Sequence, residues 1–161
     1  MTYSRFVDWL IIHNSIMSVF GERLKELIEE VGLTPAQISR QSTISDTQLS
    51  DWLRYNKVPL PNTLVKVAKF FDCSVDFLLG QKDEVDIKFR AVFVPFAERL
   101  TALIAKSQKT QYRICKELHF NSPMMTGWLK KGKLPNYENL VMLADYFDVS
   151  CDYLLGISDN R

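Results

Sequence analysis

The sequence predicts an all-α protein built from two similar domains in tandem, each with five short helices. The first observation is an internal repeat: a shift of 76 positions aligns residues 20–80 with residues 96–156 without a gap, and 22 of the 61 aligned positions are identical. The second is that apolar residues recur at helical spacing in both copies, with no alternating pattern that indicates a strand. The repeat divides the chain into an N-terminal extension (1–19), a first domain (20–80), a linker (81–95), a second domain (96–156) and a C-terminal tail (157–161).

The composition is that of a globular protein without a strong overall charge. Hydrophobic residues make up 47% of the 161 positions, which is enough for packed cores, and the formal charge is +1. Affinity for a nucleic acid must therefore come from local clusters of basic residues. Three cysteines without a CxxC spacing favour neither disulfides nor a metal site, and the short apolar runs favour neither a signal peptide nor a membrane span, so we expect a cytoplasmic protein.

The first helix of each domain is indicated by an amphipathic stripe. Its apolar positions are Phe20, Leu24, Leu27, Ile28 and Val31 in the first copy, and Phe96, Leu100, Leu103 and Ile104 in the second.

Capping residues predict where the later helices begin. Thr34 and Thr110 have the side chains preferred before a second helix that ends near residues 42 and 118, and Pro35 suits the first helical position. The caps expected for the third and fifth helices are Ser45, Asn121, Ser74 and Ser150, and the glycines expected to end the last turn are Gly80 and Gly156.

The third and fourth helices are indicated by apolar residues at helical spacing. In the third helices these residues are Leu49, Trp52, Leu53 and Met125, Trp128, Leu129, and their spacing places both tryptophans in a core. In the fourth helices they are Leu64, Val67, Ala68, Phe71 and Leu140, Leu143, Ala144, Phe147.

Two short helices joined by about four residues and surrounded by three more are typical of a helix-turn-helix domain. The segments FGERLKELIEEVGLTPAQIS, ISDTQLSDWLR and SVDFLLG resemble the Cro and phage-repressor (XRE) family, and FAERLTALIAKSQKTQYRIC through SCDYLLG resembles it again. The resemblance implies two lambda-repressor-like domains that bind double-stranded DNA through their third helices. Thr43 and His119 stand in the turn where the family usually has glycine, and Pro35 replaces the glutamine that Gln111 retains.

The resemblance also implies which side chains contact DNA. In the first copy they are Ser45, Asp46, Thr47, Gln48, Asp51, Arg54 and Lys57, and in the second they are Gln111, Asn121, Ser122, Pro123, Met124, Thr126, Gly127, Lys130, Lys131 and Lys133. Among these, the base-facing positions are Asp46, Thr47 and Asp51 in the first copy and Ser122, Pro123 and Gly127 in the second.

Charge distinguishes the two copies. Residues 34–57 have a net charge of +1, whereas residues 110–133 have a net charge of +4, because the second copy carries the run KKGK after its third helix. Pro123 and Gly127 offer no side-chain hydrogen bonds, so the second copy is expected to bind tightly but to contact few bases. Two interpretations of the acidic first copy remain open: its carboxylates accept from cytosine, or its face no longer binds DNA.

The remaining segments leave alternatives open. Residues 3–16 form either a helix that packs on this chain or on a second one, or a poorly ordered tail, and the apolar segment 81–95 is expected to lie against a domain. No catalytic constellation, metal site or cofactor site is evident, so we expect a protein that is not an enzyme. The expected partner is double-stranded DNA, with a homodimer or a protein partner such as a toxin as alternatives, and with no membrane and no small-molecule ligand.

Overall fold

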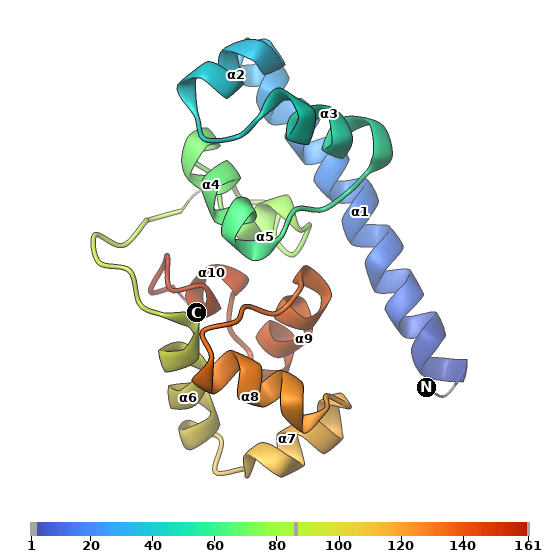
Figure 1. Ribbon diagram of the computed structural model, residues 1–161, viewed down its shortest axis with the longest axis vertical. Helices are drawn as coiled ribbons and strands as arrows, with labels where there is room; N and C mark the ends of the chain where they lie inside the picture. The colour runs from blue at the N-terminus through green and yellow to red at the C-terminus, as the bar shows by residue number, and fades with distance from the viewer. Residues whose placement is uncertain (1–2, 86, 161) are drawn as a thin grey trace. The chain divides into compact units, whose positions relative to one another are not determined.

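The computed structural model describes residues 3–85 and 87–160, with side chains from Ile16 onward. The chain forms two compact units, Met1–Ile87 and Lys88–Arg161. The helices of the first unit are α1 (Tyr3–Val31), α2 (Pro35–Gln41), α3 (Asp46–Tyr55), α4 (Pro61–Phe71) and α5 (Val75–Leu78). Those of the second are α6 (Phe96–Lys106), α7 (Gln111–Leu118), α8 (Ser122–Lys130), α9 (Tyr137–Phe147) and α10 (Cys151–Leu154) (Figure 1).

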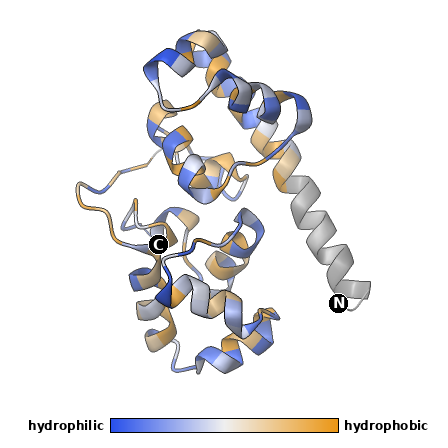
Figure 2. Cartoon of the chain, viewed as in Figure 1, coloured by the Kyte–Doolittle hydropathy of each residue, from blue (hydrophilic) through white to orange (hydrophobic). Residues whose placement is uncertain are grey.

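The described residues contain helices and loops but no strand, so the predicted all-α fold is confirmed. Outside the part of α1 that is drawn in grey, the helices carry both hydrophilic and hydrophobic residues, as amphipathic helices do (Figure 2). In the first unit, α3 packs against α1 and α2, and α5 packs against α1 and α4. In the second, α8 packs against α6 and α7, and α10 packs against α6 and α9.

The predicted caps begin the helices. The Thr34 hydroxyl accepts a hydrogen bond from the Gln37 backbone N–H, and the Thr110 hydroxyl accepts one from Arg113. The other expected N-caps are confirmed in the same way and are Ser45, Ser74, Asn121 and Ser150. Because these groups satisfy backbone donors that would otherwise lack a partner, each short helix has a fixed start.

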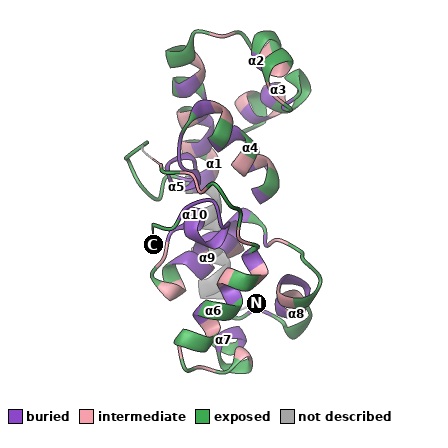
Figure 3. Cartoon of the chain, turned by 90° about the vertical axis from the view of Figure 1, so that its left-hand side faces the viewer, coloured by how far each residue is buried: buried purple, intermediate pink, exposed green. Residues whose placement is uncertain are grey.

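The two predicted core tryptophans are buried. Trp52 is 5% exposed and Trp128 is 4% exposed. The ring of Trp52 packs edge-on against Phe20, and that of Trp128 packs edge-on against Phe120. Figure 3 shows that α9 and α10 are largely buried, whereas α2, α3, α7 and α8 keep an exposed outer face.

The turn before the third helix differs between the units. In the second unit His119 adopts a left-handed conformation with φ 59°, the conformation for which glycine is usually selected. In the first unit Thr43 does not adopt a positive φ, and α2 ends one repeat position earlier, at Gln41, with Ser42 extended. A β-branched residue disfavours positive φ, and the shorter helix removes the need for it.

The expected domain boundaries at residues 19 and 156 fall inside folded structure. Helix α1 runs from Tyr3 to Val31 without a break, and Ile16 is only 3% exposed. The packing of the side chains before Ile16 lies outside the described residues. At the other end, Ile157 and Ser158 are 3% and 2% exposed, so residues expected to form a tail belong to the second unit's core.

The linker lies partly against each unit. The Ser74 N–H donates to the Val85 carbonyl within the first unit, with an N–O distance of 3.2 Å. Within the second unit, the Val94 N–H donates to the Gly156 carbonyl at 3.3 Å. A Cβ on Gly156 would lie 1.7 Å from the Val94 oxygen, so this contact requires glycine.

An arginine clasp extends the repeat beyond residues 80 and 156. Arg23 forms a salt bridge with Asp83 at 2.7 Å and stacks on Phe77, with 4.4 Å from its Cζ to the ring centre. At the equivalent positions, Arg99 forms a salt bridge with Asp159 at 2.7 Å and lies 4.1 Å above Tyr153. Hydrogen bonds from Arg99 and Arg90 lower the pKa of Asp159. Each clasp ties the chain after the fifth helix to the first helix of its unit.

Candidate nucleic-acid interface

The first turn of α3 is exposed at the residues expected to face bases. Asp46 and Thr47 are exposed, and the Asp51 side chain, one turn later, is 41% exposed. The opposite side of α3 is anchored by Leu49 and Trp52, which are buried. This amphipathic division leaves a short polar surface that a groove of DNA could accept.

Two of the expected contact residues in the first unit also form a capping box. The Ser45 oxygen accepts from the Gln48 backbone N–H at 3.2 Å, and the Gln48 side-chain oxygen accepts from the Ser45 N–H at 3.1 Å. Their oxygens are therefore occupied within the helix, and the Gln48 amide nitrogen is the group left to donate outward. The sequence predicted Ser45 as the cap of this helix, but it did not predict the reciprocal hydrogen bond to the Gln48 side chain.

The second unit has a similar exposed turn at the start of α8. Asn121, Ser122 and Pro123 are exposed, and the Asn121 side-chain oxygen caps the helix by accepting from the Met124 N–H at 2.8 Å. Met124, Thr126 and Gln111, which were also expected to contact DNA, are partly buried.

Gly127 is buried and does not offer the surface that its base-facing assignment requires. The Lys133 side chain covers it: a Cβ built on Gly127 would lie 3.4 Å from the Lys133 Cδ. The backbone N–H groups of Lys131 and Lys133 both donate to the Gly127 carbonyl at 3.2 Å. Gly127 thus serves as the attachment point of the basic loop that follows α8.

The last residue of α8 and that basic loop together expose three cations. Lys130, Lys131 and Lys133 are all exposed, and none forms a salt bridge with a residue whose side chain is described. Gly132, between them, adopts φ 62° and allows the loop to turn sharply. Ammonium groups without a protein partner attract an anionic polymer more strongly than paired ones do.

The equivalent loop of the first unit is less basic and is internally paired. Arg54 and Lys57 are exposed, but the Lys57 ammonium lies 3.3 Å from the Asp51 carboxylate and 5.3 Å from the centre of the Tyr55 ring. Tyr55 stands where the second unit has Lys131. The sequence predicted the difference in net charge but not this pairing.

A charge cluster on the second unit fixes α7. Glu117 accepts hydrogen bonds from Lys109 at 2.8 Å, from Arg113 at 2.9 Å and from the Tyr146 hydroxyl. These three donors, Lys109 first, lower the pKa of Glu117 to about 2. Because Tyr146 belongs to α9, the cluster ties α7 to α9, and nothing in the sequence pattern pointed to it.

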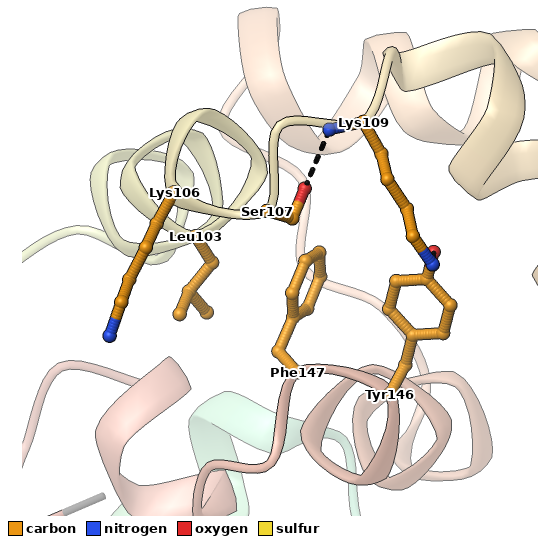
Figure 4. A pocket seen from close by; sticks show the side chains of 6 residues that line it. All are labelled: Leu103, Lys106, Ser107, Lys109, Tyr146 and Phe147. Atoms are coloured by element: carbon orange, nitrogen blue, oxygen red, sulfur yellow. Dashed lines mark hydrogen bonds between the residues drawn. The ribbon is translucent and has the colours of Figure 1, made fainter.

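Two shallow hollows lie beside this cluster. One, of about 580 Å³, is lined by Tyr112, Arg113, Lys116, Glu117 and His119 on the exposed side of α7. The other, of about 290 Å³, lies between the ends of α6 and α9 (Figure 4). Leu103 and Phe147 line it together with Lys106, Ser107 and the paired Lys109 and Tyr146. Within the described residues there is no cluster of three or more potential metal ligands.

Comparison with known proteins supports part of this interpretation. Residues 24–78, from α1 to the end of α5, match a family model described as "Helix-turn-helix". The chain is also 37% identical over 68 residues to the "HTH-type transcriptional regulator ImmR" of Bacillus subtilis (strain 168), a match that covers 42% of this chain and 53% of that protein. The chain thus spans about half the length of the curated relative it matches, and no solved structure matches it significantly.

Residues 24–78 therefore form a helix-turn-helix domain of the XRE type, and α2 and α3 are its two central helices. The matched residues lie in the first repeat, although the retained glutamine Gln111 made the second repeat look more typical of the family. For the second repeat the family resemblance stays a prediction. None of the helices in the described ranges combines the length and hydrophobicity needed to span a bilayer.

Proposed function

We propose that this protein is a transcriptional regulator of the repressor-like type that binds specific sequences in double-stranded DNA through two tandem helix-turn-helix domains. The observation that carries the proposal is the helix-turn-helix domain at residues 24–78, in which the first turn of α3 is exposed while its other side is buried. A helix of this kind enters the major groove with its first turn against the base edges.

The second repeat supports a division of labour. It has the same order of five helices and an N-capped α8, and its unpaired lysines Lys130, Lys131 and Lys133 suit contacts with backbone phosphates. Ser122 and Pro123 present little hydrogen-bonding capacity to bases. The second repeat then supplies most of the affinity, and the first repeat supplies more of the base discrimination.

The protein acts in the cytoplasm and is not an enzyme under this proposal. Its three cysteines are buried and have no CxxC spacing, which suits a reducing compartment. Promoter occupancy by the protein, rather than a chemical reaction, is its means of regulation. Two recognition helices in one chain also let a monomer act as a covalent pseudo-dimer.

Selection of bound duplexes from a random pool tests the proposal. Because the two repeats differ at all three base-facing positions, we expect an enriched site with two unlike halves. A palindromic site would indicate homodimers that each use one repeat. Failure to enrich any sequence at low salt would overturn the proposal.

A protein-interaction module is the alternative, and one observation favours it. The first unit exposes Tyr55 and Leu60, at 62% and 72%, on either side of the loop after α3, and α3 itself carries the acidic residues Asp46 and Asp51. Such a face suits a partner protein better than a polyanion. A partner held by apolar contacts would stay bound as salt rises, whereas DNA binding weakens steeply.

A further inference from the structure

The two repeats hold the same lysine against different neighbours. Lys57 and Lys133 occupy equivalent positions, and so do Asp51 and Gly127. In the first unit the Lys57 ammonium forms a salt bridge with Asp51 at 3.3 Å. In the second, the aliphatic part of Lys133 lies over Gly127 and its ammonium has no salt bridge to a described side chain.

We propose that the residue at position 51 or 127 determines how many phosphates each repeat neutralises, with Asp51 acting as an internal counter-anion that withholds Lys57 from DNA. The inference rests on the proposed DNA-binding function. A lysine that exchanges one anion for another brings no new positive charge to the backbone and displaces no additional counterion. Lys133, which has no such anion beside it, displaces one.

The Lys57–Asp51 salt bridge is exposed enough for DNA phosphates to compete with Asp51 for the Lys57 ammonium. The side chains of Lys57 and Asp51 are 60% and 41% exposed, and salt bridges this exposed are weak. Tyr55 adds a second attraction, since the ammonium lies 5.3 Å from its ring centre. Asp51 therefore reduces the phosphate contact of the first repeat without preventing the domain from approaching DNA.

A double-mutant cycle in the full-length chain tests the inference. The proteins are the wild type, Asp51→Asn, Lys57→Ala and the double variant, and the measurement is fluorescence anisotropy with a labelled duplex of mixed sequence over a salt series. Asp51→Asn should steepen the slope of log K against log salt by about 0.9, the value for one additional phosphate. Lys57→Ala should flatten the slope by about 0.9 in the Asp51→Asn background and leave it nearly unchanged in the wild type.

Two other outcomes of this cycle would overturn the inference, and they differ in whether the proposed DNA-binding function survives. An equal effect of Lys57→Ala in both backgrounds would overturn the inference alone, because Asp51 would then act only by repelling DNA. If the wild-type chain bound no duplex even at the lowest salt, the inference and the proposed function would both be overturned.

The reciprocal substitution tests the same position in the second repeat. Gly127→Asp should flatten the salt slope by about 0.9 relative to Gly127→Asn, which has the same shape without the charge. The added Cβ would lie 3.4 Å from the Lys133 Cδ, an ordinary contact, so the carboxylate starts close to this lysine. Thermal unfolding by circular dichroism checks that both variants are folded, and equal slopes for the two would contradict the inference independently of the first cycle.

Discussion

The two repeats reach the same arrangement of helices through different turns and present different charges. In the first, α2 ends at Gln41 and the chain passes Thr43 without a positive φ, whereas in the second α7 continues to Leu118 and His119 takes the left-handed conformation. The caps and the buried tryptophans are common to both. The position of the third helix therefore depends on its cap and its core side chains more than on the residue in the turn.

The charged surfaces differ more than the cores do. The last residue of α8 and the loop after it carry three lysines without salt bridges to described residues, while the loop after α3 carries Lys57 already paired with Asp51. Core residues must fill a fixed volume, so they stay similar between the two repeats, whereas exposed residues can change with little effect on stability. The surfaces are where the functions of the repeats can diverge.

The largest effect should come from the cores. Trp128→Ala should lower the free energy of unfolding of the second unit by about 3–5 kcal/mol, because it leaves a cavity beside Phe120, and Trp52→Ala should act similarly on the first. Differential scanning calorimetry of the two variants should show a different part of the transition moving in each case. If both variants shifted the whole transition equally, the two units would unfold together.

The charged loop of the second repeat should have the next largest effect. Replacing Lys130, Lys131 and Lys133 by Ala should flatten the salt slope by about 2.7, or about 0.9 for each phosphate, and weaken binding to all sequences alike. The matched variant with Arg54 and Lys57 replaced by Ala should flatten it by about 0.9, because Lys57 is paired. If the first variant bound like the wild type while Asp46→Asn with Asp51→Asn lost a specific site, the first repeat would supply the affinity.

The sequence was sufficient to predict the features that depend on local pattern. The caps, the tryptophan cores and the left-handed glycines at Gly80 and Gly156 follow from residue types at fixed spacing, and the structure confirms them. The repeat itself predicted which positions are equivalent.

Contacts between distant residues could not be predicted in the same way. The clasp between Arg99 and Asp159 joins residues 60 positions apart, and the Tyr146–Glu117 contact joins residues 29 apart. The family resemblance assigned Gly127 to the bases, and no spacing rule shows that a lysine six residues later covers it. Side chains that approach each other only in the folded state leave no periodic signal in one sequence.

A smaller effect should distinguish the two turns. His119→Gly should raise the stability of the second unit by up to about 1 kcal/mol, because glycine adopts a positive φ without strain. Thr43→Gly should lower that of the first by about 0.5–1 kcal/mol, because the turn there gains nothing from glycine and the unfolded chain becomes more flexible. Urea unfolding of both variants gives the two values, and the same sign for both would mean that the turns are alike.

The smallest effect concerns how the stability of the second repeat depends on pH. Glu117 lies in the second repeat, and the equivalent residue of the first repeat, Gln41, does not titrate. The pKa of Glu117 is lowered from 4.5 to about 2 by hydrogen bonds from Lys109, Tyr146 and Arg113. A carboxylate whose pKa is lower in the folded than in the unfolded state stabilises the fold above its unfolded pKa and loses that contribution as the pH falls through its folded pKa. The melting temperature of Glu117→Gln should therefore lie slightly below that of the wild type above about pH 5, with the difference disappearing near pH 2. Asp159 titrates in both proteins, so the difference between them isolates Glu117. A difference that stayed constant from pH 7 to about pH 2 would show that Glu117 stabilises the second repeat by packing and not by its charge.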